Sequence, residues 1–188
     1  RQFMATVCLM RYARFTVNPK HLEVADKNLQ YNLKTFYKEE KNLGIIEYDG
    51  SAKLGAAALA GLAILEHSET ASYQGYLEAL CRAVEFLWQP HGEFKTFHKP
   101  TDRNDNQNFY PGEALLFWAF LLFETKAPVI LEKSLKSFDY YRIWHRKNTN
   151  SAFIPWHTQA YFILYEYCQE QQQWEAAAAL KEFIFEMN

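Results

Sequence analysis

The sequence predicts an all-α protein built from helical hairpins in two layers, and three observations support this. Glu, Leu and Ala dominate the periodic stretches, and these residues are good helix formers. The seven Gly and six Pro stand mostly at segment borders, which favours long regular elements. Stretches that are apolar on every side alternate with stretches that are apolar on one side, four times along the chain.

The first kind of stretch predicts inner helices that are buried on all sides. It comprises residues 53–66 (KLGAAALAGLAILE), 111–124 (PGEALLFWAFLLFE) and 155–168 (PWHTQAYFILYEYC), and the opening residues 4–15 supply a fourth copy. A helix without a polar face has no side to present to water. These four helices are therefore expected to line the core.

The second kind of stretch predicts outer, amphipathic helices. Residues 21–40, 73–88, 129–147 and 174–187 place apolar side chains at helical spacing, with Lys and Glu between them. Helix starts are marked by Asn18 with Pro19, by Ser72 before Tyr73, and by Pro128. The expected result is about four hairpins in a single domain, residues 1–188, which is long enough to bury a real core.

One segment interrupts this pattern. Residues 91–110 form about twenty residues without periodicity, and a loop of that length in a compact domain is usually functional. The spacing between copies is also uneven, whereas tetratricopeptide and ankyrin arrays keep a shorter and steadier period.

Charge and hydropathy exclude several classes of protein. The net charge of −2 and a pI near 6.3 give no electrostatic reason to bind nucleic acid or an anionic membrane surface. No apolar run reaches the roughly 20 residues that a membrane span needs. The chain begins abruptly at Arg1 in a helical pattern, which indicates a fragment of a longer chain. Localisation and oligomeric state therefore stay open.

Metal and cofactor motifs are missing as well. The three cysteines are far apart among apolar neighbours and are expected to be buried, reduced thiols; they are Cys8, Cys81 and Cys168. His91, His98 and Asp102 match no metal-ligand spacing. Because phosphate-loop, dinucleotide and GxSxG motifs are also absent, we predict no metal and no cofactor.

The stretches KLGAAALAGLAILE, FYPGEALLFWAFLLFE and IPWHTQAYFILYEY resemble the inner helices of (α/α) toroid proteins. They are most similar to the six-hairpin carbohydrate-active proteins, which include glycosidase-like, epimerase-like and uncharacterised members. The resemblance implies either a toroid or, since about four hairpins are counted here, a partial arc of one. It also implies a ligand site at the end where loops lead into the inner helices.

Helix N-termini carry partial positive charge and free N–H groups, so polar ligands find partners there. The resemblance therefore points to residues just before or within the first turn of each inner helix. The candidate catalytic residues are Glu113, Asp49, His157 and Tyr110. The candidate substrate-binding residues are Lys53, Trp156, Arg103, Asp102, Gln159 and Tyr48. Two carboxylates would permit glycoside hydrolysis, and a carboxylate with Tyr or His would permit epimerisation or elimination.

Each candidate also has a structural interpretation. If Pro111 opens its helix, Glu113 is the third helical residue, where a glutamate reaches back to cap the N-terminus. His157 and Trp156 fit a packing role in the core, and Asp49 precedes Gly50 in a turn signal. The aliphatic part of the Lys53 side chain could lie along apolar surface and place the ammonium in solvent.

We therefore expect a carbohydrate-active protein that acts on an oligo- or polysaccharide through carboxylate acid/base chemistry. The alternative is a noncatalytic domain that binds a glycan or a protein. A related toroid with other chemistry, such as a terpenoid-cyclase-like or zinc-dependent member, is opposed by the lack of zinc ligands and of an Asp-rich box.

Overall fold

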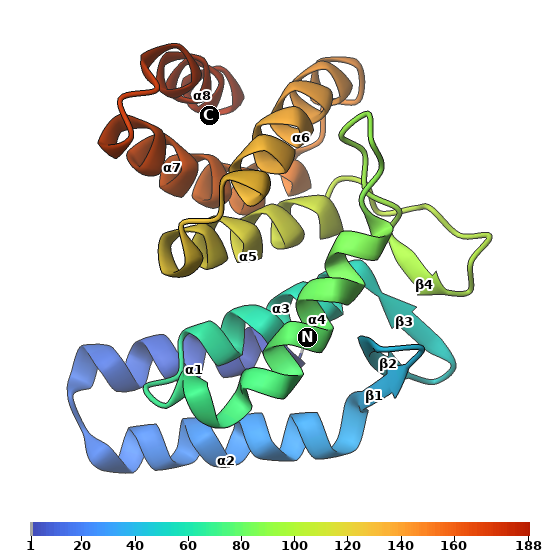
Figure 1. Ribbon diagram of the computed structural model, residues 1–188, viewed down its shortest axis with the longest axis vertical. Helices are drawn as coiled ribbons and strands as arrows, with labels where there is room; N and C mark the ends of the chain where they lie inside the picture. Colours follow the sequence, from blue (N-terminus) through green and yellow to red (C-terminus); the bar gives the residue numbers. More distant parts are fainter. Residues whose placement is uncertain (1) are drawn as a thin grey trace. The chain divides into compact units, whose positions relative to one another are not determined.

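The computed structural model describes residues 2–188, and these residues form eight α-helices, two short 310 helices and a small antiparallel sheet (Figure 1). The helices are α1 Gln2–Thr16, α2 Pro19–Phe36, α3 Leu54–Leu65, α4 Gln74–Leu87, α5 Tyr110–Thr125, α6 Pro128–Lys147, α7 Ile154–Glu170 and α8 Trp174–Met187. The 310 helices η1 Thr70–Tyr73 and η2 Ser151–Phe153 lead into α4 and α7. The predicted helical character is confirmed.

The chain forms two compact units. Unit 1 comprises Arg1–Leu87 and Phe97–Arg103, and unit 2 comprises Trp88–Thr96 and Asn104–Asn188. In unit 1, α2 packs on α1, α4 packs on α3, and α1 also contacts α3. Unit 2 repeats this scheme, because α6 packs on α5, α8 packs on α7, and α5 also contacts α7. Within each unit, the odd-numbered helices thus form one layer, with the even-numbered helices packed against it.

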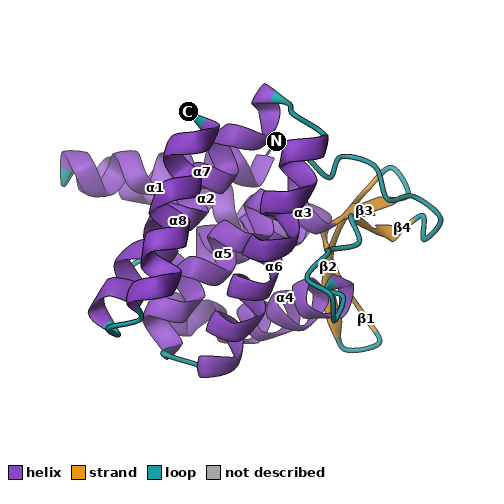
Figure 2. Cartoon of the chain, turned by 90° about the horizontal axis from the view of Figure 1, so that it is seen from above, coloured by secondary structure: helices purple, strands orange, loops and turns teal. Residues whose placement is uncertain are grey.

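A four-stranded sheet in unit 1 corrects the all-α prediction. Its strands pair in the order β1 Tyr37–Glu40, β2 Leu43–Tyr48, β3 Ser51–Lys53 and β4 Phe97–Lys99, and Figure 2 shows them gathered together. The predicted helix 21–40 therefore ends at Phe36, and its last four residues are strand β1. Part of the predicted loop 91–110 supplies β4.

Local chemistry explains the two hairpins. Lys41 and Asn42 connect β1 to β2, and Asp49 and Gly50 connect β2 to β3, all four with positive φ. Two consecutive left-handed residues make the tight turn that suits the twist of a hairpin. Gly44 is required because a Cβ there would lie 2.9 Å from the backbone of α4 at Ala79 and Leu80.

Burial separates the predicted inner helices into two pairs. In α3 and α5 nearly every residue of the first three turns is buried, as predicted. By contrast, α1 and α7 bury one face only, and Phe15 of α1 and Phe162 of α7 are 85% and 50% exposed. The prediction of all-round burial is wrong for these two helices, because nothing in the described chain covers their second face.

The predicted helix starts are largely confirmed. Asn18 is the N-cap of α2 and accepts a hydrogen bond from the Lys20 N–H, with Pro19 in the first turn. Pro128 opens α6. The region of Ser72 instead forms a 310 turn, and α4 begins one residue later than predicted. Among residues 2–188, no helix has the length and apolar character needed to span a bilayer.

The three cysteines are free thiols. Cys168 is buried and Cys81 is half-buried, but Cys8 is exposed on the open face of α1, which corrects the prediction that all three are buried. Burial raises the pKa of Cys168 to about 11 and that of Cys81 to about 12.

Candidate functional site

The N-terminal turns of α5 and α7 meet in unit 2, and a glycine allows this approach. A Cβ on Gly112 would lie 2.7 Å from both the His157 Nδ1 and the Trp156 Cβ. Real Cβ atoms do not come so close to their neighbours. Three predicted site residues, Glu113, Trp156 and His157, are therefore brought to one junction.

The structure corrects the predicted capping role of Glu113. Helix α5 begins at Tyr110, so Glu113 is its fourth residue rather than its third. A capping carboxylate would accept hydrogen bonds from the N–H groups at the start of the helix. These groups already have an acceptor, because Phe109 and Tyr110 both donate their N–H to the Asn106 carbonyl. No hydrogen bond joins the Glu113 carboxyl to another residue within 2–188.

Glu113 is nevertheless buried, with only 8% of its surface exposed. Burial removes water from the carboxylate and raises the pKa of Glu113 to about 7. A carboxyl group with this pKa is partly protonated at neutral pH, so the same group can donate or accept a proton. Raised carboxyl pKa values of this kind are typical of general acids in enzymes.

His157 is held by its surroundings as a neutral ring. Its Nδ1 lies 2.8 Å from the Phe153 carbonyl oxygen, and since only a protonated Nδ1 can donate to a carbonyl, the proton is on Nδ1. The ring stacks on Phe153 with 3.4 Å between centroids. Complete burial lowers the pKa of His157 to about 3, and its buried Nε2 has no hydrogen-bond partner among residues 2–188. These contacts favour the structural interpretation of His157.

The other unit 2 candidates lie around the same junction. Tyr110 is half-buried as the first residue of α5, and Trp156 is half-buried in the first turn of α7. Gln159 is exposed and donates to the carbonyl of Pro155 on its own helix. Trp156 therefore combines packing against α5 with partial access to solvent.

The amide-rich run before α5 is structural. Gln107 donates to the Phe94 carbonyl and accepts from the Tyr141 hydroxyl at 2.7 Å, while Tyr141 accepts from the Phe94 N–H. Asn104 accepts from the Thr96 N–H. These bonds hold the loop onto α6, so the loop that precedes Glu113 has a defined path.

Unit 1 contains a cavity of about 540 Å³ beside its sheet. Its walls come from α1, α2, β2, β3 and the first turns of α3, and they comprise Gln2, Phe3, Phe36, Ile46, Tyr48, Ser51, Lys53, Ala56 and Leu59. Two predicted binding residues, Tyr48 and Lys53, therefore line one cavity. Tyr48 is 72% exposed and packs edge-on against Phe36, with ring centroids 5.9 Å apart.

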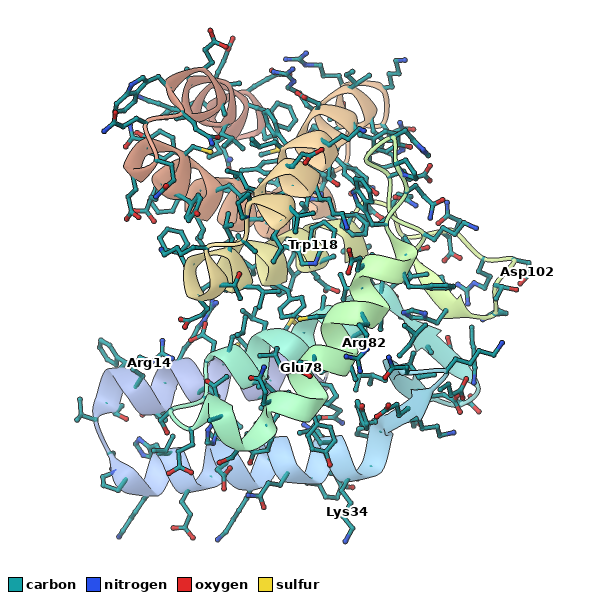
Figure 3. The ribbon with its side chains drawn as sticks, viewed as in Figure 1. Arg14, Lys34, Glu78, Arg82, Asp102 and Trp118 are labelled. Atoms are coloured by element: carbon teal, nitrogen blue, oxygen red, sulfur yellow. The ribbon has the colours of Figure 1, made fainter. Side chains whose placement is uncertain are left out.

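The remaining candidates lie on exposed turns of unit 1. Asp49 is at the tip of the β2–β3 hairpin, where its positive φ accounts for the Asp-Gly pair. Asp102 is exposed at the outer tip of the loop after β4 (Figure 3). The Arg103 guanidinium lies over the Phe97 ring, 4.2 Å from its centroid, and the Lys53 Nζ lies 5.9 Å from the same centroid.

The two predicted carboxylates belong to different units, Asp49 to unit 1 and Glu113 to unit 2. The residues that sequence reasoning missed are the aromatic walls of the cavity, Phe3 and Phe36, together with Gln2 and Ser51. No local motif marks them, since the cavity arises only when α1, α2 and the sheet pack together.

Within residues 2–188, no three His, Cys, Asp or Glu side chains are grouped so as to hold a metal ion. Neither a known protein-family model nor a curated protein sequence matches this chain.

Proposed function

We propose that this protein is a carbohydrate-active protein of the (α/α) toroid class, with residues 1–188 as a single domain forming an arc of the ring. The layered packing within each unit supports the proposal, because odd-numbered helices contact each other and even-numbered helices pack against them. The sheet of unit 1 would be an addition to that plan, with β1, β2 and β3 inserted between α2 and α3 and β4 inserted between α4 and α5.

The observation that carries the proposal is the Glu113 carboxyl. It is buried, it has no hydrogen-bond partner within residues 2–188, and its pKa is raised to about 7. Keeping a carboxyl buried in such a place costs stability, and strongly raised carboxyl pKa values cluster at functional sites.

Glu113 would act as the proton donor and acceptor of the reaction. In its protonated form it can donate to the oxygen of a glycosidic bond as the leaving alcohol departs. In its ionised form it can remove a proton from a water molecule or from a sugar carbon beside a carbonyl. This single group therefore serves glycosidase, epimerase and lyase chemistry alike.

Sugar binding beside Glu113 would use side chains of unit 2. Trp156, adjacent to the Glu113 turn, presents a half-buried ring that can stack on the C–H face of a sugar. Gln159, an exposed side chain of the same helix as Trp156, would supply donors for the oxygen atoms of the sugar.

The alternative is a noncatalytic domain that binds a glycan or a protein. One observation favours it: no Asp or Glu of residues 2–188 lines the unit 1 cavity, and Asp49 lies on an exposed hairpin tip. The ligand-sized cavity and the raised carboxyl are in different units, and a binding function needs only the cavity.

A glycan panel screened for binding and for turnover tests the proposal, using the wild type, Glu113→Gln and the matched control Glu124→Gln. Glu124 is an exposed glutamate on the same helix. We expect turnover to fall at least a hundredfold in Glu113→Gln, with binding retained and the control unaffected. Turnover that survives in Glu113→Gln would remove Glu113 from the reaction, and binding without any turnover would support the noncatalytic alternative.

A further inference from the structure

We infer that the unit 1 cavity binds a small amphipathic anion, in which one carboxylate or phosphate group is joined to an alkyl or aromatic body. This inference goes beyond the proposed function, and it holds whether or not Glu113 transfers a proton. It rests on the shape, lining and charge of the cavity.

The size of the cavity suits a small molecule. Its volume of about 540 Å³ falls within the range of roughly 300–1,000 Å³ that is usual for ligand sites. Its lining is mainly apolar, with the rings of Phe3 and Phe36 and the aliphatic side chains of Ile46 and Leu59. Such walls bind an apolar body, because burying it removes apolar surface from water.

Among residues 2–188, the polar side chains that line the cavity are one cation and several neutral groups. Lys53 is the cation, and the neutral groups are Gln2, Ser51 and the Tyr48 hydroxyl. No carboxylate of residues 2–188 pairs with the Lys53 ammonium, which lies over the Phe97 ring. The neighbouring Glu47 is engaged elsewhere, by Lys38 and by Lys99 at 2.9 Å.

The backbone next to Lys53 adds to the positive potential. Lys53 is the N-cap residue of α3, and its side chain does not cap the helix. The first turn of α3 therefore keeps the partial positive charge of a helix N-terminus, and Ala56 of that turn is part of the cavity lining. An anionic group near Lys53 would be stabilised both by the Lys53 ammonium and by the N-terminus of α3.

These features together favour an amphiphile over a simple sugar. A sugar presents hydroxyl groups on all its edges, and the apolar walls would leave many of them without hydrogen bonds, which costs free energy. An amphiphile matches both parts of the lining: its anionic head can pair with the Lys53 ammonium, and its apolar body can pack against the Phe3 and Phe36 rings.

The test uses two matched pairs of probes, octanoate with 1-octanol and glucuronate with glucose, titrated by calorimetry into the whole chain. Four variants accompany the wild type: Lys53→Met removes the charge, Lys53→Arg keeps it, Ala56→Phe fills the cavity, and Lys34→Met is the control. Lys34 is an exposed lysine of α2 (Figure 3). Circular dichroism establishes that each variant is folded.

We expect octanoate to bind at least tenfold more tightly than octanol to the wild type, to Lys53→Arg and to Lys34→Met. Lys53→Met should abolish this preference, and Ala56→Phe should weaken the binding of both octanoate and octanol. Equal affinity for octanoate and octanol in the wild type would overturn the inference, as would binding of glucuronate without octanoate. Neither result bears on Glu113, because the proposed function is judged by the turnover of glycans and its loss in Glu113→Gln.

Discussion

Gly112 and His157 lie so close that a methyl group on the glycine would meet the His157 Nδ1 at 2.7 Å. Gly112→Ala should therefore force α5 and α7 apart and lower the free energy of unfolding by about 1–3 kcal/mol. Urea unfolding followed by circular dichroism measures the change.

Gly75 in α4 is the matched control, because a Cβ there meets nothing within 4 Å. Gly75→Ala should leave stability unchanged or raise it by about 0.5–1 kcal/mol, since alanine favours the helix. If both variants lose stability equally, the close approach of α5 and α7 is not the cause.

The pKa of Glu113 predicts a dependence of stability on pH. The folded value of about 7 lies above the 4.5 of an ordinary glutamate. Between these values the folded chain holds a proton that the unfolded chain has released. The contribution of Glu113 to the free energy of unfolding is therefore fully present below pH 4.5 and is lost as pH rises through 7. The total loss is about 3 kcal/mol.

The neutral variant Glu113→Gln isolates this effect. Relative to the wild type, it should gain stability steadily between pH 4.5 and pH 8 in urea unfolding experiments. Burial also lowers the pKa of the fully buried His157 to about 3 and that of the half-buried His98 to about 4, but both histidines are present in both proteins, so their effects cancel. A difference that is constant with pH would contradict the raised pKa of Glu113.

The Tyr141 hydroxyl holds the loop before α5 through two bonds, one to the Gln107 side chain and one from the Phe94 N–H. Tyr141 is fully buried, so Tyr141→Phe leaves the buried Phe94 N–H without its acceptor and removes the donor to the half-buried Gln107 side chain. We expect a loss of about 1–3 kcal/mol in unfolding free energy. Tyr31→Phe, which removes a hydroxyl from a side chain that is 63% exposed, should change stability by less than about 0.5 kcal/mol.

The thiols should differ in reactivity. Cys8 is exposed, whereas burial raises the pKa of Cys81 to about 12 and that of Cys168 to about 11. A disulfide reagent at pH 8 should label one thiol rapidly in the folded protein and all three in urea. The rapid phase should be absent in Cys8→Ser, and its persistence there would show that another thiol is accessible.

The helices could be predicted from the sequence because each carries its signal locally. The apolar runs of α3 and α5 have no polar face, and Asn18 with Pro19 marks the start of α2. The sheet was missed, although Asp49-Gly50 between Ile46 and Ala52 is a hairpin signal. Its strands are short, and a helical pattern runs directly into β1.

The candidate site was predictable in part. The position of Glu113 at the mouth of a buried helix follows from the Pro-Gly-Glu sequence before an apolar run. That Glu113 does not cap the helix could not be predicted. The backbone turns at Asn106, which has a positive φ, and the Asn106 carbonyl accepts the N–H groups at the start of the helix. The cavity walls could not be predicted, since Phe3 and Phe36 meet only through tertiary packing.

The chain crosses between its two units three times, at residues 87–88, 96–97 and 103–104. Strand β4, which completes the sheet of unit 1, is therefore flanked on both sides by segments of unit 2. Any single cut before β4 removes it from unit 1, and any later cut separates Phe94 from Tyr141 or divides unit 2 elsewhere. No one breakpoint in the gene would yield both units whole, so a single crossover could not exchange either unit as a module.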